Sequence, residues 1–229
     1  MLSPDDIEIV IPSRKRVESC QRTVALFPPG KVSVCVAEDE AEDYRDVGAP
    51  IVTHPPTRGL GQLRQWILDN YRSRCIVQCN DDVEGLLAMP GKRPRLITEP
   101  DAIFRIIWNS AHICDELGIS VFCYNPVGSD VRKFWNNDPF RFNRIEGCFF
   151  GMIGRKVRLD PDVWQHDDVD LTLECMLKDR IVWQDSRFAP KHNFMTKSGG
   201  NSVSRGKERM ASELAYMKRK WGKFLTVLQ

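Results

Sequence analysis

Two carboxylates and an amide stand together at Asn80, Asp81 and Asp82, directly after an apolar run at residues 75–79. Oxygen ligands of this type suit Mg²⁺ or Mn²⁺. An ion held there could bridge the oxygens of a diphosphate and stabilise a leaving nucleotide. A polar turn in which an aspartate caps the next helix would use the same residues. Taken alone, the three residues leave both interpretations open.

A second acidic cluster consists of Asp167, Asp168 and Asp170, at the start of an amphipathic segment that predicts a helix over residues 168–178. Acids at a helix N-terminus interact favourably with the helix dipole, so a purely structural role would account for them. Alternatively, one of them is a general base that deprotonates an acceptor hydroxyl. Three acids within four residues exceed what a cap requires, and their mutual repulsion could raise one pKa.

Other polar groups could meet an anion or a metal ion. His192 could bind a Mn²⁺-type ion through its neutral nitrogen. Lys197 lies in a glycine- and serine-rich stretch that could meet a phosphate. Pro12, Ser13 and Arg14 end the first apolar run, and the basic residues there could face a nucleotide. A structural histidine, a plain connector and a solvated loop are the competing interpretations.

The elements that must position these groups alternate in the first half of the chain. Short, continuous apolar runs predict buried strands at residues 7–11, 32–37, 51–53 and 75–79. Three- and four-residue spacing predicts helices at residues 60–71 and 98–117, the second capped by Thr98 and closed by Gly118. Glu38 and Asp39 follow the second strand and could hydrogen-bond a base or a ribose.

The alternation predicts an α/β fold with a mostly parallel central sheet, helices on both faces, and ligands at the carboxyl ends of the strands. The second half predicts mixed strands at residues 119–124, 146–153 and 181–183. We therefore expect one domain, with a first half at 1–95, a second half at 96–200 and a basic C-terminal helix at 201–229.

Composition supports an ordinary globular protein. Of 229 residues, 42% are apolar and 28% are charged, and no apolar run approaches the roughly 20 residues of a membrane-spanning helix. The acidic start has no signal-peptide pattern, so a cytoplasmic protein without a membrane partner is expected. The eight cysteines form no CxxC pair and lie mostly in apolar runs, which indicates buried, reduced thiols.

Charge is distributed unevenly along the chain. Residues 191–229 hold nine Lys or Arg and two Glu, a net charge of +7, whereas the other 190 residues have a net charge of −5. A basic tail on an acidic body suggests that the tail meets an anion. A solvated amphipathic helix would have the same composition.

The order and spacing of these segments resemble those of GT-A glycosyltransferases over roughly residues 7–200. Residues 9–14 are similar to the strand end beside the nucleotide, and residues 58–64 to the glycine-containing segment that contacts the nucleotide-sugar. The resemblance assigns the sugar donor to these residues: Pro12, Ser13, Arg14, Glu38, Asp39, Gly59, Gln62, Arg64, Asn80, Asp81 and Lys197.

The same resemblance implies a metal centre and a base. Residues 80–82 take the place of the DxD motif, with asparagine at its first position, so Asp82 and His192 are the expected ligands of Mn²⁺ or Mg²⁺. Residues 167–171 resemble the Glu-Asp motif that opens a helix. Asp168 takes the position of the catalytic base, flanked by Asp167 and Asp170.

Within this superfamily the chain most resembles the TET-associated glycosyltransferases of phages. The resemblance implies transfer from a nucleoside diphosphate sugar, a UDP-sugar, to a hydroxymethylated pyrimidine in DNA. DNA would be the anion that the basic tail meets. The target base would have to leave the duplex, and stacking and charge could come from the segment with Arg132, Lys133, Trp135, Phe140, Arg141, Phe142 and Arg144. An ordinary half-buried loop is the alternative for that segment.

Two rival functions use the same residues differently. A sugar nucleotidyltransferase would show a glycine-rich signature after the first strand, which residues 12–15 lack. A non-catalytic DNA-binding protein would use the basic tail but would leave both acidic clusters unexplained.

Overall fold

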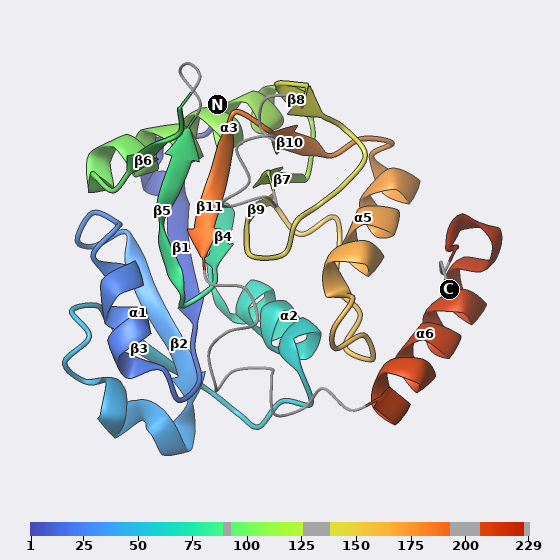
Figure 1. The fold of residues 1–229 in the computed structure, drawn as a ribbon, viewed down its shortest axis with the longest axis horizontal. Coiled ribbons are helices and arrows are strands. Elements are labelled where there is room, and N and C mark those ends of the chain that lie inside the picture. The colour runs from blue at the N-terminus through green and yellow to red at the C-terminus, as the bar shows by residue number, and fades with distance from the viewer. Residues whose placement is uncertain (89–92, 126–137, 193–206, 227–229) are drawn as a thin grey trace.

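The computed structural model describes residues 1–88, 93–125, 138–192 and 207–226. In these residues an eight-stranded sheet has the order β3-β2-β1-β4-β9-β7-β10-β8, and a three-stranded sheet has the order β11-β5-β6 (Figure 1). The predicted α/β fold with a large, mostly parallel central sheet is confirmed.

The first four strands form the parallel part of the large sheet. β1 (Ile7–Pro12) pairs with β2 (Val32–Ala37) on one side and with β4 (Cys75–Cys79) on the other, and β2 pairs with β3 (Ile51–His54). The chain thus moves outward from β1 to β3 and then returns to the other side of β1. Ligands bind at such a reversal of strand order, so the ends of β1 and β4 are the expected binding edge.

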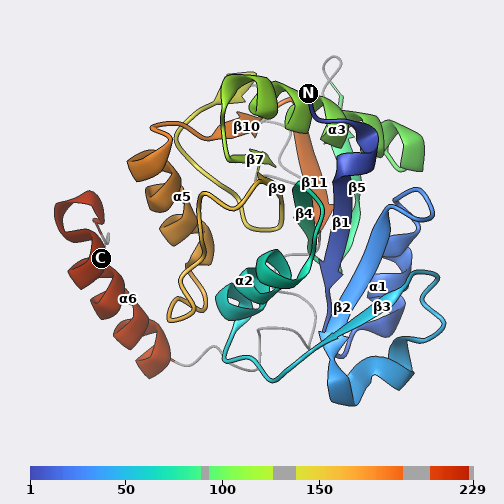
Figure 2. The same cartoon turned by 180° about the vertical axis from the view of Figure 1, so that it is seen from behind.

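Successive residues of β1 point to opposite faces of the sheet, and helices pack against both faces. On one face Ile9 belongs to a hydrophobic cluster with α1 (Val17–Val24) and α3 (Pro100–Leu117). On the other face Val10 belongs to a cluster with α2 (Leu60–Asn70) and α5 (Asp167–Lys178) (Figure 2).

The second half is mixed, as predicted. β9 (Phe149–Ile153) runs antiparallel to β4 and to β7 (Val121–Tyr124), and β10 (Trp183–Asp185) pairs with β7 and with β8 (Phe140–Arg141). The strand expected at residues 146–153 begins only at Phe149, so residues 146–148 lie in the loop that leads into it.

The small sheet was not predicted. β5 (Val83–Ala88) begins directly after the Asn-Asp-Asp segment, and it pairs with β6 (Arg95–Ile97) and β11 (Phe188–His192). The register places His192 opposite Val83. This pairing brings the predicted histidine ligand beside the predicted aspartate ligand, although the two are more than 100 residues apart in sequence.

The helix ends differ slightly from the expectation. α3 begins at Pro100 with Glu99 as its N-cap, in place of the predicted Thr98, and it ends at Gly118 in the left-handed conformation with φ 69°. Short 3₁₀ helices cover Pro4–Asp6, Glu38–Tyr44 and Gly222–Phe224. All eight cysteines are free thiols, and only Cys148 is not fully buried.

The basic C-terminal helix is present as α6 (Lys207–Trp221). It lies at the edge of the molecule alongside α5, as Figures 1 and 2 show from opposite sides. Among the described residues, no helix has the length and apolar character needed to cross a membrane.

Candidate active site

Asp81 is held rigidly where β1 and β4 end side by side. Its Oδ2 accepts a hydrogen bond from Ser13 Oγ at 2.7 Å, and its Oδ1 lies 3.2 Å from Arg16 Nη1. Ser13 Oγ also lies 2.9 Å from the Tyr44 hydroxyl. Burial raises the pKa of Asp81, although Ser13 and Arg16 both favour its charged form. The adjacent strand ends therefore fix this carboxylate in one orientation.

Asp82 is fixed less completely than Asp81. Its Oδ2 lies 3.7 Å from Arg16 Nη1, whereas its buried Oδ1 has no hydrogen-bond partner among the described residues. A buried carboxylate oxygen without a hydrogen-bond partner is unfavourable unless a bound ligand or ion interacts with it. A carboxylate oxygen and an imidazole nitrogen are donor types that Mn²⁺ accepts, and the strand register places His192 opposite the residue after Asp82, so the residues fit the expected ion.

The described residues contain no group of three or more His, Cys, Asp or Glu side chains that could hold a metal ion by themselves. Mg²⁺-type sites often use one or two protein carboxylates, with phosphate oxygens of the substrate completing the coordination. A site built on Asp82 and His192 is therefore of the kind that needs a bound diphosphate.

Arg64 connects the two acidic clusters. Its side chain, only 2% exposed, donates from Nη1 to Asp167 and from Nη2 to the carbonyl of Gly147. Nη2 also lies 3.3 Å from Asn80 Oδ1, and the guanidinium lies 5.0 Å from the centre of the Phe150 ring. One buried cation thus holds the end of β4, the approach to β9 and the start of α5 together.

Asp168 is the acid of the second cluster that faces fewest partners. Among the described residues its carboxylate accepts one hydrogen bond, from the amide of Val169 at 2.8 Å. Burial and the adjacent Asp167 carboxylate raise the pKa of Asp168. A carboxylate with a raised pKa is a stronger base, so this position suits proton abstraction.

Glu146, which was not predicted from the sequence, lies close enough to Asp168 for the two charges to interact. Burial and, to a smaller extent, the Asp168 charge raise the pKa of Glu146 to about 7, although Arg144 opposes the change. Arg144 Nη2 lies 2.7 Å from Glu146 Oε1. The only sequence signal for Glu146 is an acid just before the strand that pairs with β4.

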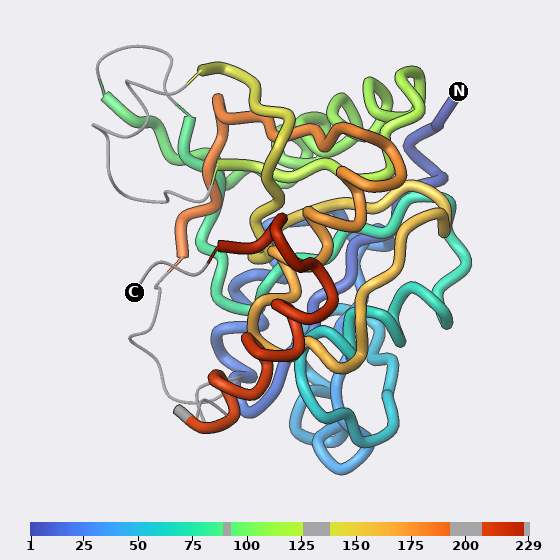
Figure 3. The backbone as a smooth tube through the Cα atoms, turned by 90° about the vertical axis from the view of Figure 1, so that its right-hand side faces the viewer, coloured from blue at the N-terminus to red at the C-terminus, as the bar shows by residue number. Residues whose placement is uncertain are grey.

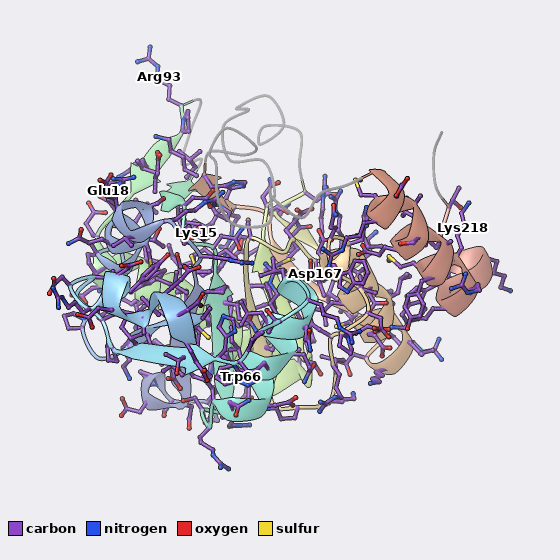
Figure 4. All side chains as sticks on the ribbon, turned by 90° about the horizontal axis from the view of Figure 1, so that it is seen from below. Lys15, Glu18, Trp66, Arg93, Asp167 and Lys218 are labelled. Carbon is purple, nitrogen blue, oxygen red and sulfur yellow. The ribbon has the colours of Figure 1, made fainter. Side chains whose placement is uncertain are left out.

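Asp170 has a different position from Asp168. Its carboxylate lies 2.8 Å and 3.0 Å from Lys220 Nζ and accepts a hydrogen bond from Trp221 Nε1 at 2.7 Å. It therefore lies on the side of α5 that faces α6. In Figure 4 Asp167 lies near the centre of the molecule, between α2 and α5, whereas Lys218 of α6 lies at the outer edge.

The acids expected to hold the nucleotide base are exposed. Glu38 and Asp39 begin the 3₁₀ helix that follows β2, and both point to solvent. The buried acid of this segment is Glu40, which accepts the amide hydrogen of Lys15 at 2.8 Å and lies 3.6 Å from Arg14 Nε. Glu40 therefore fixes the loop after β1, a role that the sequence analysis missed.

The glycine-containing segment lies at the N-terminus of α2. A side chain at Gly59 would bring a Cβ within 2.8 Å of Trp164 Cβ. The Gln62 side-chain oxygen accepts the amide hydrogen of Arg58 at 2.8 Å, which stabilises the first turn. Glycine at position 59 is thus needed for contact with the segment that precedes Asp167.

The aromatic segment proposed for base stacking is partly described. The rings of Phe140 and Phe142 lie 4.8 Å and 5.7 Å from the ring of Trp183, and Phe142 is 45% exposed. Arg132, Lys133 and Trp135, like Lys197 of the glycine-rich stretch, lie outside the described residues.

Several solved sugar transferases share this fold. Glucosyl-3-phosphoglycerate synthase from Mycobacterium tuberculosis, solved with Mn²⁺, UDP-glucose and phosphoglyceric acid, is 11% identical with a TM-score of 0.58, over 93% of this chain and 79% of that chain. Mannosyltransferase PcManGT from Pyrobaculum calidifontis, solved with GDP-Man and Mn²⁺, is 14% identical with a TM-score of 0.57, over 94% and 63% of the two chains.

A third similar structure is S. aureus TarS 1–349 with UDP-GlcNAc, which is 12% identical with a TM-score of 0.53, over 93% of this chain and 66% of that chain. In another TarS 1–349 structure the matched part is 60% of that chain. The chain thus spans less than two thirds of TarS and of PcManGT. Identities this low show a shared GT-A fold and nothing finer.

None of the curated proteins compared with the sequence matches it. A family model does match, over residues 7–200, a range that includes the described site residues discussed above but not Lys218, Lys220 and Trp221 of α6. On this match, the chain belongs to the TET-associated glycosyltransferase family.

Proposed function

We propose that the chain transfers a sugar from a nucleoside diphosphate sugar, a UDP-sugar, to the hydroxyl group of a hydroxymethylated pyrimidine in DNA. The observation that carries the proposal is the buried Asp82 Oδ1, which has no partner among the described residues at the edge where β1 and β4 end. Arg64 links this edge to the Asp167-Asp168 start of α5.

The sugar donor is expected to lie along this edge. Ser13, Asn80 and Asp81 line the strand ends, and Asp82 with His192 would hold Mn²⁺ or Mg²⁺ against the diphosphate. When bound, the ion would neutralise charge that develops on the departing nucleoside diphosphate. Solved proteins of this fold with Mn²⁺ and UDP-glucose, or with GDP-Man and Mn²⁺, support this choice of ligands.

Asp168 is the proposed general base for an inverting transfer. The acceptor hydroxyl oxygen bonds to the anomeric carbon, the bond from that carbon to the diphosphate oxygen breaks, and the hydroxyl proton moves to Asp168. The raised pKa of Asp168 strengthens it as a base. Arg64 and Asp167 hold its backbone in place.

The family description and the charge of α6 both support DNA as the acceptor. Lys218, Arg219 and Lys223 are exposed at the end of the chain, where they could neutralise phosphates without reading sequence. The modified base would have to leave the duplex to bring its hydroxyl to Asp168.

The proposal is tested by incubating the protein with UDP-glucose, UDP-GlcNAc or GDP-mannose, with and without Mn²⁺. Oligonucleotides with hydroxymethylcytosine, hydroxymethyluracil or unmodified pyrimidines serve as acceptors. Mass spectrometry is expected to find one added hexose-type unit on a hydroxymethylated oligonucleotide only, with release of nucleoside diphosphate.

Each rival function predicts a different result. Release of pyrophosphate from a nucleoside triphosphate and a sugar phosphate would indicate a nucleotidyltransferase. Salt-sensitive DNA binding, with no nucleotide binding and no added mass on any oligonucleotide, would indicate a non-catalytic DNA-binding protein.

A further inference from the structure

Helix α6 lies outside the family match, yet it packs against the segment that leads into the proposed base. The match ends at residue 200, and α6 covers Lys207–Trp221. Viewed from the side in Figure 3, α6 passes directly in front of α5. α6 makes polar contacts with α5 and with the segment before it. A solvated amphipathic helix, which composition alone also allows, would make no such contacts.

Glu213 makes the central contact. The residue is 3% exposed, and its carboxylate accepts hydrogen bonds from the backbone amides of Trp164 at 2.6 Å, Gln165 at 3.1 Å and His166 at 3.0 Å. His166 Nδ1 lies 2.7 Å from the same carboxylate. These amides directly precede α5, whose own N-cap residue, His166, makes no side-chain cap hydrogen bond. A residue of α6 thus holds the three residues that lead into α5, the last of which is the N-cap of that helix.

The same segment packs against the N-terminus of α2. The Arg209 guanidinium of α6 lies 3.9 Å from the centre of the Trp164 ring and donates to the carbonyl of Arg58. A Cβ at Gly61 would lie 2.1 Å from the carbonyl oxygen of Val163. Residues 163–166 are therefore wedged between α6 and the segment expected to contact the sugar donor.

A second set of contacts anchors the other end of α6. Lys220 Nζ lies 2.8 Å from Asp160 Oδ2 and 2.8 Å from Asp170 Oδ1, and the Tyr216 hydroxyl donates to Asp160 at 2.8 Å. These contacts hold α6 on the body of the protein without touching residues 164–166. These contacts are independent of Glu213, so α6 keeps them when the Glu213 side chain is changed.

We propose that Glu213 is a positioning residue, through which α6 fixes residues 164–166 and thereby sets the orientation of Asp167 and Asp168. The proposal rests on the proposed function for its effect on catalysis. A small shift of a reacting group is enough to slow a reaction ~100-fold, so loss of these hydrogen bonds is expected to lower kcat by ~10- to 100-fold.

The experiment compares Glu213→Gln with the matched control Tyr216→Phe in the full chain. Glutamine keeps the shape of the side chain, but its amide group cannot accept from three backbone amides and a histidine at once. Phenylalanine removes one hydrogen bond of α6 and leaves the Glu213 contacts intact. Hydrogen exchange of residues 164–170, melting temperature, and kcat and KM with Mn²⁺ and the active nucleotide sugar are measured for each variant.

Faster exchange across residues 164–170 and a ~10- to 100-fold lower kcat in Glu213→Gln, with near wild-type values in Tyr216→Phe, would support the proposal. Unchanged exchange in Glu213→Gln would overturn it. So would losses of kcat in both variants that merely follow their melting temperatures. If the wild-type protein transfers no sugar, the proposed function fails, while the exchange of residues 164–170 still decides whether Glu213 positions this segment.

Discussion

The aspartates that follow β4 and the aspartates that begin α5 differ in the partners that hold them. After β4, Asp81 is held by Ser13 and Arg16, whereas Asp82 keeps one buried oxygen without a partner in the described residues. At α5, Arg64 holds Asp167 and Lys220 holds Asp170, whereas within the described part of the chain Asp168 accepts a hydrogen bond only from the Val169 amide.

In both clusters, then, paired acids fix the backbone and one acid is left for chemistry. The partners differ in origin. The first cluster is organised by Ser13 and Arg16, which follow β1, whereas the second depends on α2 and on α6. Both clusters therefore depend on partners that are distant in sequence, but those of the first lie at the neighbouring strand end, whereas those of the second come from helices packed outside the sheet.

The largest effect is expected when the unpaired acid of the second cluster is changed. Asp168→Asn removes the proposed base and should lower kcat by ~10²–10⁴-fold with little change in KM for the sugar donor. Asp170→Asn is the matched control, because Asp170 binds Lys220 and Trp221, so its kcat should fall far less. Steady-state kinetics of both variants measure this difference, and equal losses would break the distinction between them.

Breaking the link between the clusters should mainly affect stability. Arg64→Met leaves Asp167 as a buried charge without its cation, which is expected to lower the free energy of unfolding by about 3–5 kcal/mol. Arg58→Met, an exposed position six residues earlier, should change it little. Urea denaturation gives both values, and a small loss for Arg64→Met would show that the clusters are independent.

Whether a feature of the site could be predicted depended on how far apart in the sequence its contacting residues lie. The strand before Asn80 and the helix after Asp167 were predictable, because an apolar run or a helical period lies next to the acids in sequence. Arg16, Glu146 and Glu213 were not, because their roles come from partners that only folding brings near. β5 and β11 were missed for a different reason, because Glu84 and Lys191 interrupt their short apolar patterns.

The first cluster can be tested through the hydrogen bond from Ser13 to Asp81. Ser13→Ala leaves a buried carboxylate oxygen without that donor and should cost about 1–3 kcal/mol of unfolding free energy. Ser33→Ala is a suitable control, because Ser33 is buried in the neighbouring strand and its hydrogen bond to the Tyr71 hydroxyl is longer, at 3.3 Å. Equal losses in the two variants would argue against a special role for Ser13.

The smallest expected effect concerns Glu146 and pH. Because its pKa is about 7 in the folded protein and near its ordinary 4.5 when unfolded, the folded state binds more protons between these values. Stability should therefore fall as pH rises from about 5 to about 7 by on the order of 1 kcal/mol, and Glu146→Gln should flatten this dependence. Urea denaturation across this range measures it, and an unchanged slope in Glu146→Gln would assign the dependence to other groups.

The most direct test of the account is the effect of Mn²⁺ on nucleotide binding by the wild-type protein and by Asp82→Asn. Calorimetric titration with UDP and with GDP, each with and without Mn²⁺, measures it. We expect Mn²⁺ to strengthen binding of one nucleotide to the wild-type protein, and Asp82→Asn to abolish that gain while leaving metal-free binding unchanged. A variant that keeps the full gain would show that Asp82 does not hold the ion.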